Sequence, residues 1–140
     1  MIGDDFMEYK NSYRGLIKWL LWFLVSIFAI PFLPINDVAL LTRLSLNVMT
    51  LNIVLLMFII YKTESIYWFN GMPYKDALNA GSEKRKAFAF KHLKFFGLYA
   101  LFFFVLSVLL HIFYAPFWID ITVCCIGLIV VALSTNVIKL

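Results

Sequence analysis

The chain has 140 residues, of which 64% are hydrophobic and 14% are charged. Soluble domains have about half apolar and about a quarter charged residues, so this composition excludes an ordinary soluble protein and is typical of a membrane protein. The formal net charge of +4 does not indicate nucleic-acid binding, because the basic residues lie at the edges of the apolar runs.

Four apolar runs are long enough to cross a bilayer as helices. About 20 apolar residues suffice, because each helical residue rises 1.5 Å and the hydrocarbon layer is about 30 Å thick. The expected spans are residues 15–33, 38–61, 95–114 and 117–138, with a long connection at 62–94. We therefore predict an all-α integral membrane protein, in which residues 1–140 form a single transmembrane domain of two helical hairpins.

The distribution of lysine and arginine predicts how the spans are oriented. Basic residues lie in the N-terminal segment, in the connection 62–94 and at the C-terminal end, whereas the connections 34–37 and 115–116 contain none. The positive-inside rule then places both termini and the long connection in the cytoplasm. We take the plasma membrane, specifically the bacterial inner membrane, as the location.

The long connection carries helix signals of its own. Pro73 suits the first position of a short helix, and Gly81 suits its C-terminal cap. Ser82 can then cap a second helix that continues into the third span. We expect this second helix to form a basic elbow that lies on anionic lipid of the inner leaflet or against a partner. Anionic lipid would stabilise its binding by about 1 kcal/mol for each basic residue. Its basic residues are Lys84, Arg85, Lys86, Lys91 and Lys94.

The two short connections share a pattern that raises the question of a repeat. Residues 31–37 and 116–120 both contain Pro-Phe, then Ile, then Asp before or at the start of a span. A duplication of this kind would relate the two hairpins as parallel repeats. Since proline is also common at helix starts in unrelated proteins, we favour coincidence over duplication.

Polar residues inside the spans are costly and are therefore the candidates for a functional site. The candidates are Arg43, Asn47, Thr50, His111 and Asp120. The first three lie within about 60° of one another on a helical wheel, so the second span should face protein or water. The two charged residues and the histidine are expected in one layer near the outer leaflet.

Two interpretations of these residues stay open. In the functional one, they line a polar vestibule for an anion or a lipid headgroup, or form a seam between subunits, because a guanidinium suits carboxylate and phosphate. In the structural one, which we favour, Arg43 pairs with Asp120 or Asp37, and both aspartates cap their helices.

We expect a non-catalytic protein that works by association, as a homo-oligomer or as an accessory or protective subunit of a membrane complex. The chain has no phosphate-binding loop, metal-ligand spacing or CxxC pair, so we expect no cofactor and no metal. Its two cysteines, Cys124 and Cys125, are adjacent and should be free thiols. The main alternative is a small oligomeric channel or transporter with the second span lining the path, and a weaker one is a lipid-modifying enzyme that uses His111 and Asp120.

Overall fold

The computed structural model describes residues 9–69 and 71–140, so the parts of the predicted domain at residues 1–8 and at residue 70 lie outside the described residues. The elements in chain order are α1 (Arg14–Ala29), the 3-10 turn η1 (Ile30–Phe32), α2 (Val38–Thr63), the 3-10 turn η2 (Ile66–Trp68), α3 (Tyr74–Ala80), α4 (Ser82–Ile112) and α5 (Phe117–Thr135). α1 with η1, α2, α4 and α5 are each long and apolar enough to cross a membrane. The predicted fold class of four membrane-spanning helices is confirmed.

The helix boundaries differ from the predicted spans mainly in the long connection. α2 continues to Thr63, and α4 begins at Ser82, so much of the connection is a helical extension of the two central spans. The short helix predicted there is α3, and it ends at Gly81, whose φ of +79° is a left-handed backbone conformation that glycine adopts without steric cost. α5 ends at Thr135, earlier than the predicted position 138.

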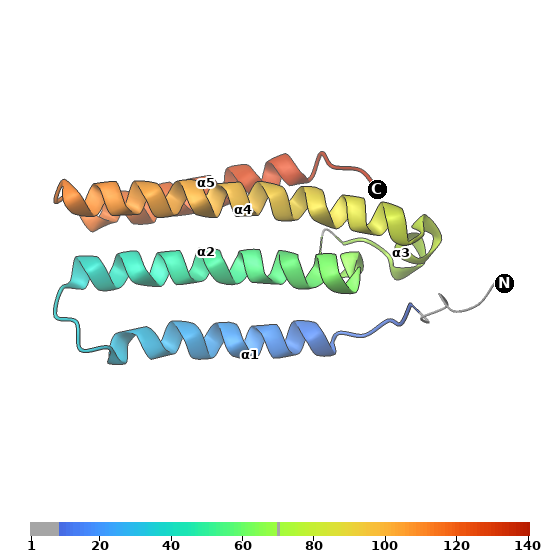
Figure 1. Cartoon of the computed structure of the whole chain (residues 1–140), viewed down its shortest axis with the longest axis horizontal. Coiled ribbons are helices and arrows are strands. Elements are labelled where there is room, and N and C mark those ends of the chain that lie inside the picture. The colour runs from blue at the N-terminus through green and yellow to red at the C-terminus, as the bar shows by residue number, and fades with distance from the viewer. Residues whose placement is uncertain (1–8, 70) are drawn as a thin grey trace.

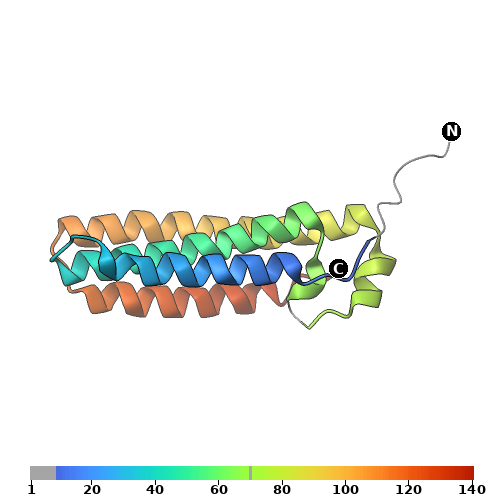
Figure 2. The same cartoon turned by 90° about the horizontal axis from the view of Figure 1, so that it is seen from below.

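α2 lies at the centre of the arrangement. In Figure 1, α1 forms one outer layer, α2 the middle layer, and α4 with α5 the other outer layer. Figure 2 shows α4 and α5 on opposite sides of the line formed by α1 and α2. α1 packs mainly against α2. The first described residues before α1, the C-terminal end and α3 lie at the same end of the bundle, as four spans require.

The main hydrophobic core lies at the α3 end of the bundle. Its buried residues are Met57, Ile60, Ile66, Tyr67, Ala77, Phe88 and Ala89. Along the spans, by contrast, many large apolar side chains point outward, among them Phe28, Leu101 and Leu133. Lipid tails are as apolar as leucine, so a spanning helix gains little by burying such side chains. The α3 end, which must exclude water, is therefore where a conventional core forms.

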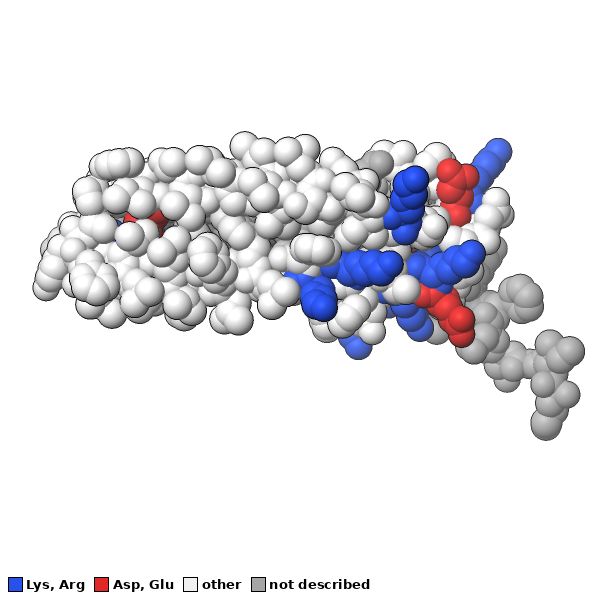
Figure 3. Space-filling view, turned by 90° about the horizontal axis from the view of Figure 1, so that it is seen from above, with Lys and Arg blue, Asp and Glu red and all other residues white. Residues whose placement is uncertain are grey.

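α4 extends beyond the hydrocarbon layer. Its 31 residues span about 46 Å at 1.5 Å per residue, against a hydrocarbon thickness of about 30 Å. Lysine and arginine side chains gather at the α3 end on the face seen in Figure 3, whereas the rest of that face is almost uncharged. The predicted basic elbow is thus the start of a continuous helix that runs from Ser82 to Ile112. The continuity of this helix into the third span agrees with the sequence analysis, and its contact with anionic lipid or a partner stays a prediction.

α4 and α5 approach each other closely at Gly127. A Cβ atom at this position would lie 2.3 Å from the Tyr99 ring. The Tyr99 hydroxyl donates a hydrogen bond to the Cys124 carbonyl oxygen at 3.0 Å, so the ring is held in place. Cys124 is buried, Cys125 is exposed and both are free thiols, as predicted.

Candidate functional site

Arg43 enters the bundle from the first turns of α2, at the end opposite to α3. The helix begins after Asp37, whose carboxylate accepts hydrogen bonds from the backbone N–H groups of Ala39 at 2.8 Å and Leu40 at 3.2 Å. This is the N-cap that the sequence predicts for Asp37, since aspartate satisfies the free N–H groups of a helix start. It fixes the first turn of α2 and, one turn further on, the direction of Arg43.

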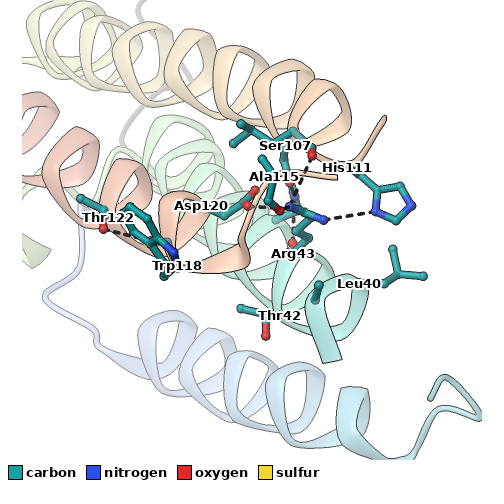
Figure 4. A network of polar contacts seen from close by, with 12 residues as sticks. Leu40, Thr42, Arg43, Ser107, His111, Ala115, Trp118, Asp120 and Thr122 are labelled. Carbon is teal, nitrogen blue, oxygen red and sulfur yellow. Dashed lines mark hydrogen bonds and ion pairs between the residues drawn. The ribbon is translucent and has the colours of Figure 1, made fainter. Parts of the chain in front are cut away.

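The Arg43 guanidinium is surrounded by acceptors from the opposite hairpin (Figure 4). Its Nε donates to Asp120 Oδ2 at 3.0 Å, and its Nη1 donates to His111 Nδ1 at 3.2 Å. Its Nη2 donates to the carbonyl oxygens of Ala115 at 2.5 Å and Leu110 at 3.5 Å. Four of the five guanidinium N–H groups therefore have partners inside the same chain.

The carbonyl groups that Arg43 reaches belong to the turn between α4 and α5. Ala115 N–H bonds to the Leu110 carbonyl oxygen at 2.9 Å, and Tyr114 N–H bonds to that of His111 at 3.1 Å, which is the Schellman pattern of a helix C-terminus. Tyr114 takes the left-handed position of this pattern, with φ of +54°, where glycine is the usual residue. Arg43 thus donates hydrogen bonds to a turn whose backbone is strained, because Tyr114 holds a position that suits glycine.

Asp120 lies one turn inside α5, and its side chain is fully buried. The prediction that it caps α5 is wrong, because Pro116 holds the N-cap position and no side chain caps this helix. The pairing with Arg43 that the structural interpretation offered is present. Asp37 and Asp120 therefore hold different positions in their helices.

His111 is the exposed member of the cluster. It accepts from Arg43 through Nδ1, so in this arrangement the ring proton is on Nε2, and Figure 4 shows the ring pointing away from the other helices. Arg43, His111 and Asp120 are in contact, as expected for one layer. The Arg43 side chain is 5% exposed and its guanidinium faces protein acceptors, so an anion from outside would have to displace Asp120.

The remaining polar residues of α2 bond within the chain. Asn47 Nδ2 donates to the Arg43 carbonyl oxygen at 2.8 Å and to Ser107 Oγ on α4 at 3.1 Å. Thr50 Oγ1 donates only along its own helix, to the Asn47 carbonyl oxygen at 2.9 Å. On another face, Asn52 Nδ2 donates to Ser26 Oγ on α1 at 3.0 Å. Such bonds hold neighbouring spans together, and the partner serines are the residues that the sequence pattern did not single out.

A second arginine cluster lies at the α3 end. Glu64 Oε2 accepts from Arg85 Nη2 at 2.8 Å and from Arg85 Nε at 2.9 Å, while Glu64 Oε1 accepts from Ser82 Oγ at 2.7 Å. Arg85 Nη1 also donates to the Ala77 carbonyl oxygen of α3 at 3.1 Å. Partial burial acts to raise the pKa of the Glu64 carboxyl, but the hydrogen bonds from Ser82 and Arg85 outweigh it and hold that pKa below its ordinary value.

Arg85 does not belong to the exposed basic surface for which it was predicted. Its side chain is buried, and its guanidinium lies 3.9 Å over the Tyr9 ring. A signal for this was present in the sequence, because Arg85, Phe88, Ala89 and His92 follow the i, i+3, i+4, i+7 spacing of one buried helix face. Lys84, Lys86, Lys91 and Lys94 are exposed as expected, and Lys86 lies 3.4 Å from Glu64.

The N-terminal segment closes this end of the bundle. Tyr9 donates its hydroxyl proton to the Glu64 carbonyl oxygen at 2.8 Å. The Ser12 backbone bonds to the Tyr67 hydroxyl at 2.9 Å and accepts from Trp68 Nε1 at 3.1 Å. Sequence reasoning missed these contacts, because aromatic residues near span ends are also typical of the headgroup layer. No protein-family model, curated protein or solved structure matches this chain.

We expect the Arg43–Asp120 pair to be strongly coupled in stability. Arg43→Ala or Asp120→Ala alone leaves one buried charge unpaired and should lower the free energy of unfolding by about 3–5 kcal/mol. The double variant should cost clearly less than the sum of the two single losses. Unfolding in mixed micelles followed by circular dichroism measures this. Arg14→Ala, which removes an exposed arginine, is the control, and additive losses for the pair would contradict the coupling.

The Glu64 cluster should make stability depend on acid. Because the folded state lowers the pKa of Glu64, the stabilisation is present above the unfolded-state pKa and is lost as pH falls through the folded-state pKa. The melting temperature of the wild type should therefore exceed that of Glu64→Gln at neutral pH, and the difference should shrink well below pH 4.5, the ordinary value. Glu83→Gln, at an exposed residue, should show no such difference. A gap for Glu64→Gln that stays constant with pH would contradict the assignment.

Proposed function

We propose that this four-span protein is non-catalytic and works by association within the bilayer, as a homo-oligomer or as an accessory or protective subunit of a membrane complex. The observation that carries the proposal is the position of α1. This helix has no buried residue and packs mainly on α2, and it forms an outer layer of the bundle in Figure 1. It therefore offers most of its surface to lipid or to another transmembrane segment.

The two faces of α1 differ in what they do. The inner face holds the helix to α2, where Trp19 Nε1 donates to the Asn52 carbonyl oxygen at 2.8 Å and Ser26 Oγ accepts from Asn52 Nδ2. The outer face carries four large exposed apolar side chains at helical spacing: Ile17, Leu21, Val25 and Phe28. Association of helices in lipid depends on van der Waals packing of such faces, so we assign the outer face of α1 as the association surface.

The alternative functions find less support. A path lined by α2 would need its polar side chains to face an aqueous space, but Arg43, Asn47 and Asn52 bond to α1, α4 or α5 within the chain. An enzyme that used Asp120 would need a carboxylate open to substrate, and this one is buried against Arg43. Because the Arg43 side chain is buried within its own chain, it is also poorly placed to contact another subunit.

We further propose that the α3 end lies in the cytoplasm of a bacterial cell, because the basic residues gather there. In a background with Cys124→Ala and Cys125→Ala, Tyr114→Cys places a thiol in the most exposed turn of the opposite end, and Lys84→Cys places one near α3. An impermeant maleimide should label Tyr114→Cys in intact spheroplasts and label Lys84→Cys only after permeabilisation. The reverse pattern would invert the orientation.

Cross-linking tests the association surface. In the same cysteine-free background, Leu21→Cys lies on the outer face of α1, and Ile126→Cys lies at a similar place along α5. These two side chains are 60% and 58% exposed, respectively, so exposure does not distinguish them. In native membranes, oxidation of Leu21→Cys should give a disulfide-linked dimer at twice the monomer mass for a homo-oligomer, and a photoreactive maleimide on the same thiol should give an adduct of another single mass for a subunit. Equal yields from both positions, with a monomer after purification, would contradict the proposal.

A further inference from the structure

An apolar groove of about 370 Å³ runs along the outside of the bundle between α2 and α4. Leu51 and Val54 line it from α2, and Gly97, Ala100, Leu101 and Phe104 line it from α4. At one end it reaches Asn47, whose amide nitrogen is already bonded to Ser107. The walls therefore offer van der Waals contact and almost no hydrogen bonds to an occupant.

The groove is open because α4 has small residues where it passes α2. A Cβ atom added at Gly97 would meet no other atom within 4 Å, so the space beside this glycine is not filled by the chain itself. Gly127, in contrast, is filled by the Tyr99 ring. Gly127 therefore allows α4 and α5 to pack closely, whereas Gly97 leaves space beside α4 for a molecule that is not part of the chain.

The groove and the helical turn beyond it together match one leaflet of a bilayer in length. α2 and α4 are antiparallel, with Asn47 bonded to Ser107 toward one end and the Tyr61 and Phe90 rings 5.9 Å apart toward the other. On α4 the groove is lined from Phe104 to Gly97, which is about 10 Å, and Lys94 lies one turn beyond it, about 15 Å from Phe104. This distance is half of the hydrocarbon thickness of about 30 Å. The groove thus begins near the bilayer centre and runs toward the α3 end.

Two lysines lie beyond the groove, on the side of the α3 end. Lys62 Nζ lies 5.6 Å from the Phe58 ring centroid and 6.0 Å from that of Tyr61, next to the ring contact that joins α2 to α4. Lys94 lies one turn from Gly97 and within about 20° of Leu101 around α4. Both lysines are exposed. The nearby Glu64 carboxylate is occupied by Arg85 and Ser82, so the positive charge of the two lysines is available to an anion.

We propose that this groove binds one anionic phospholipid from the leaflet at the α3 end, with an acyl chain between α2 and α4 and the phosphate at Lys62 and Lys94. The apolar walls, the length of one leaflet and the two lysines at the headgroup level together select this ligand. A zwitterionic phospholipid has the same chain but lacks the net charge. The inference goes beyond the proposed association, because the site lies between α2 and α4 and does not involve α1.

Native mass spectrometry of the whole protein from nanodiscs tests the proposal with phosphatidylglycerol and phosphatidylcholine of identical acyl chains. The wild type should retain one phosphatidylglycerol per chain, in preference to phosphatidylcholine. Lys62→Ala combined with Lys94→Ala should weaken phosphatidylglycerol binding by roughly 25-fold, which corresponds to about 1 kcal/mol for each lysine near an anionic headgroup. Lys84→Ala combined with Lys91→Ala removes the same charge from exposed positions of α4 turned away from Gly97, and should change the binding less than three-fold.

Gly97→Leu tests the groove itself. The Cβ atom has room, and leucine favours a helix over glycine, so the variant should fold with a melting temperature at or above that of the wild type while its side chain fills the groove. It should lose the retained lipid whatever the headgroup. Full retention by Gly97→Leu, or equal losses in the two double-lysine variants, would overturn the proposal. So would a lipid-free dimer that Gly97→Leu dissociates, since a second copy would then occupy the groove.

Discussion

The arrangement of the spans depends on one buried guanidinium. A charge inside a low-dielectric bundle is tolerated only when it is paired and its remaining donors are satisfied, and Arg43 meets this condition through Asp120, His111 and two carbonyl groups of the α4–α5 turn. These partners come from α4, α5 and the turn between them, while Arg43 comes from α2. The contact therefore sets the depth and rotation of α2 against the second hairpin, which apolar packing in lipid would leave weakly specified.

At the α3 end of the bundle, a second buried arginine makes the same kind of contact. Arg85 pairs with Glu64 and donates to a carbonyl of α3, as Arg43 pairs with Asp120 and donates to carbonyls of a turn. Around Arg85, however, the guanidinium is covered by a hydrophobic core and the Tyr9 ring. Each arginine ties a long helix to a connection, so charged contacts close the two ends of the bundle. The middle is held by apolar packing and by the uncharged hydrogen bonds of Asn47 and Asn52.

Because the polar contacts lie inside the bundle, the outer surface of the spans is available for interaction. The polar side chains of α2 are used within the chain, so function is best sought on the lipid-facing surface, where the structure offers two distinct features. One is the outer face of α1, a ridge of large side chains that suits another helix. The other is the groove beside Gly97, a hollow with two lysines at its end that suits a lipid. The two features lie on different helices, so the two proposals can be tested independently.

The sequence by itself determined the number of spans, the end at which the basic residues gather and the short helix between Pro73 and Gly81, because hydropathy, charge and turn preferences act over neighbouring residues. Only the tertiary structure decided that Asp120 is a partner and not a cap, that Arg85 is buried, and that Tyr67 holds the N-terminal segment. The groups involved are 77, 21 and 55 residues apart, respectively. Which of them meet depends on how the helices rotate and slide against one another, and a pattern along one helix does not specify that relation to its neighbours.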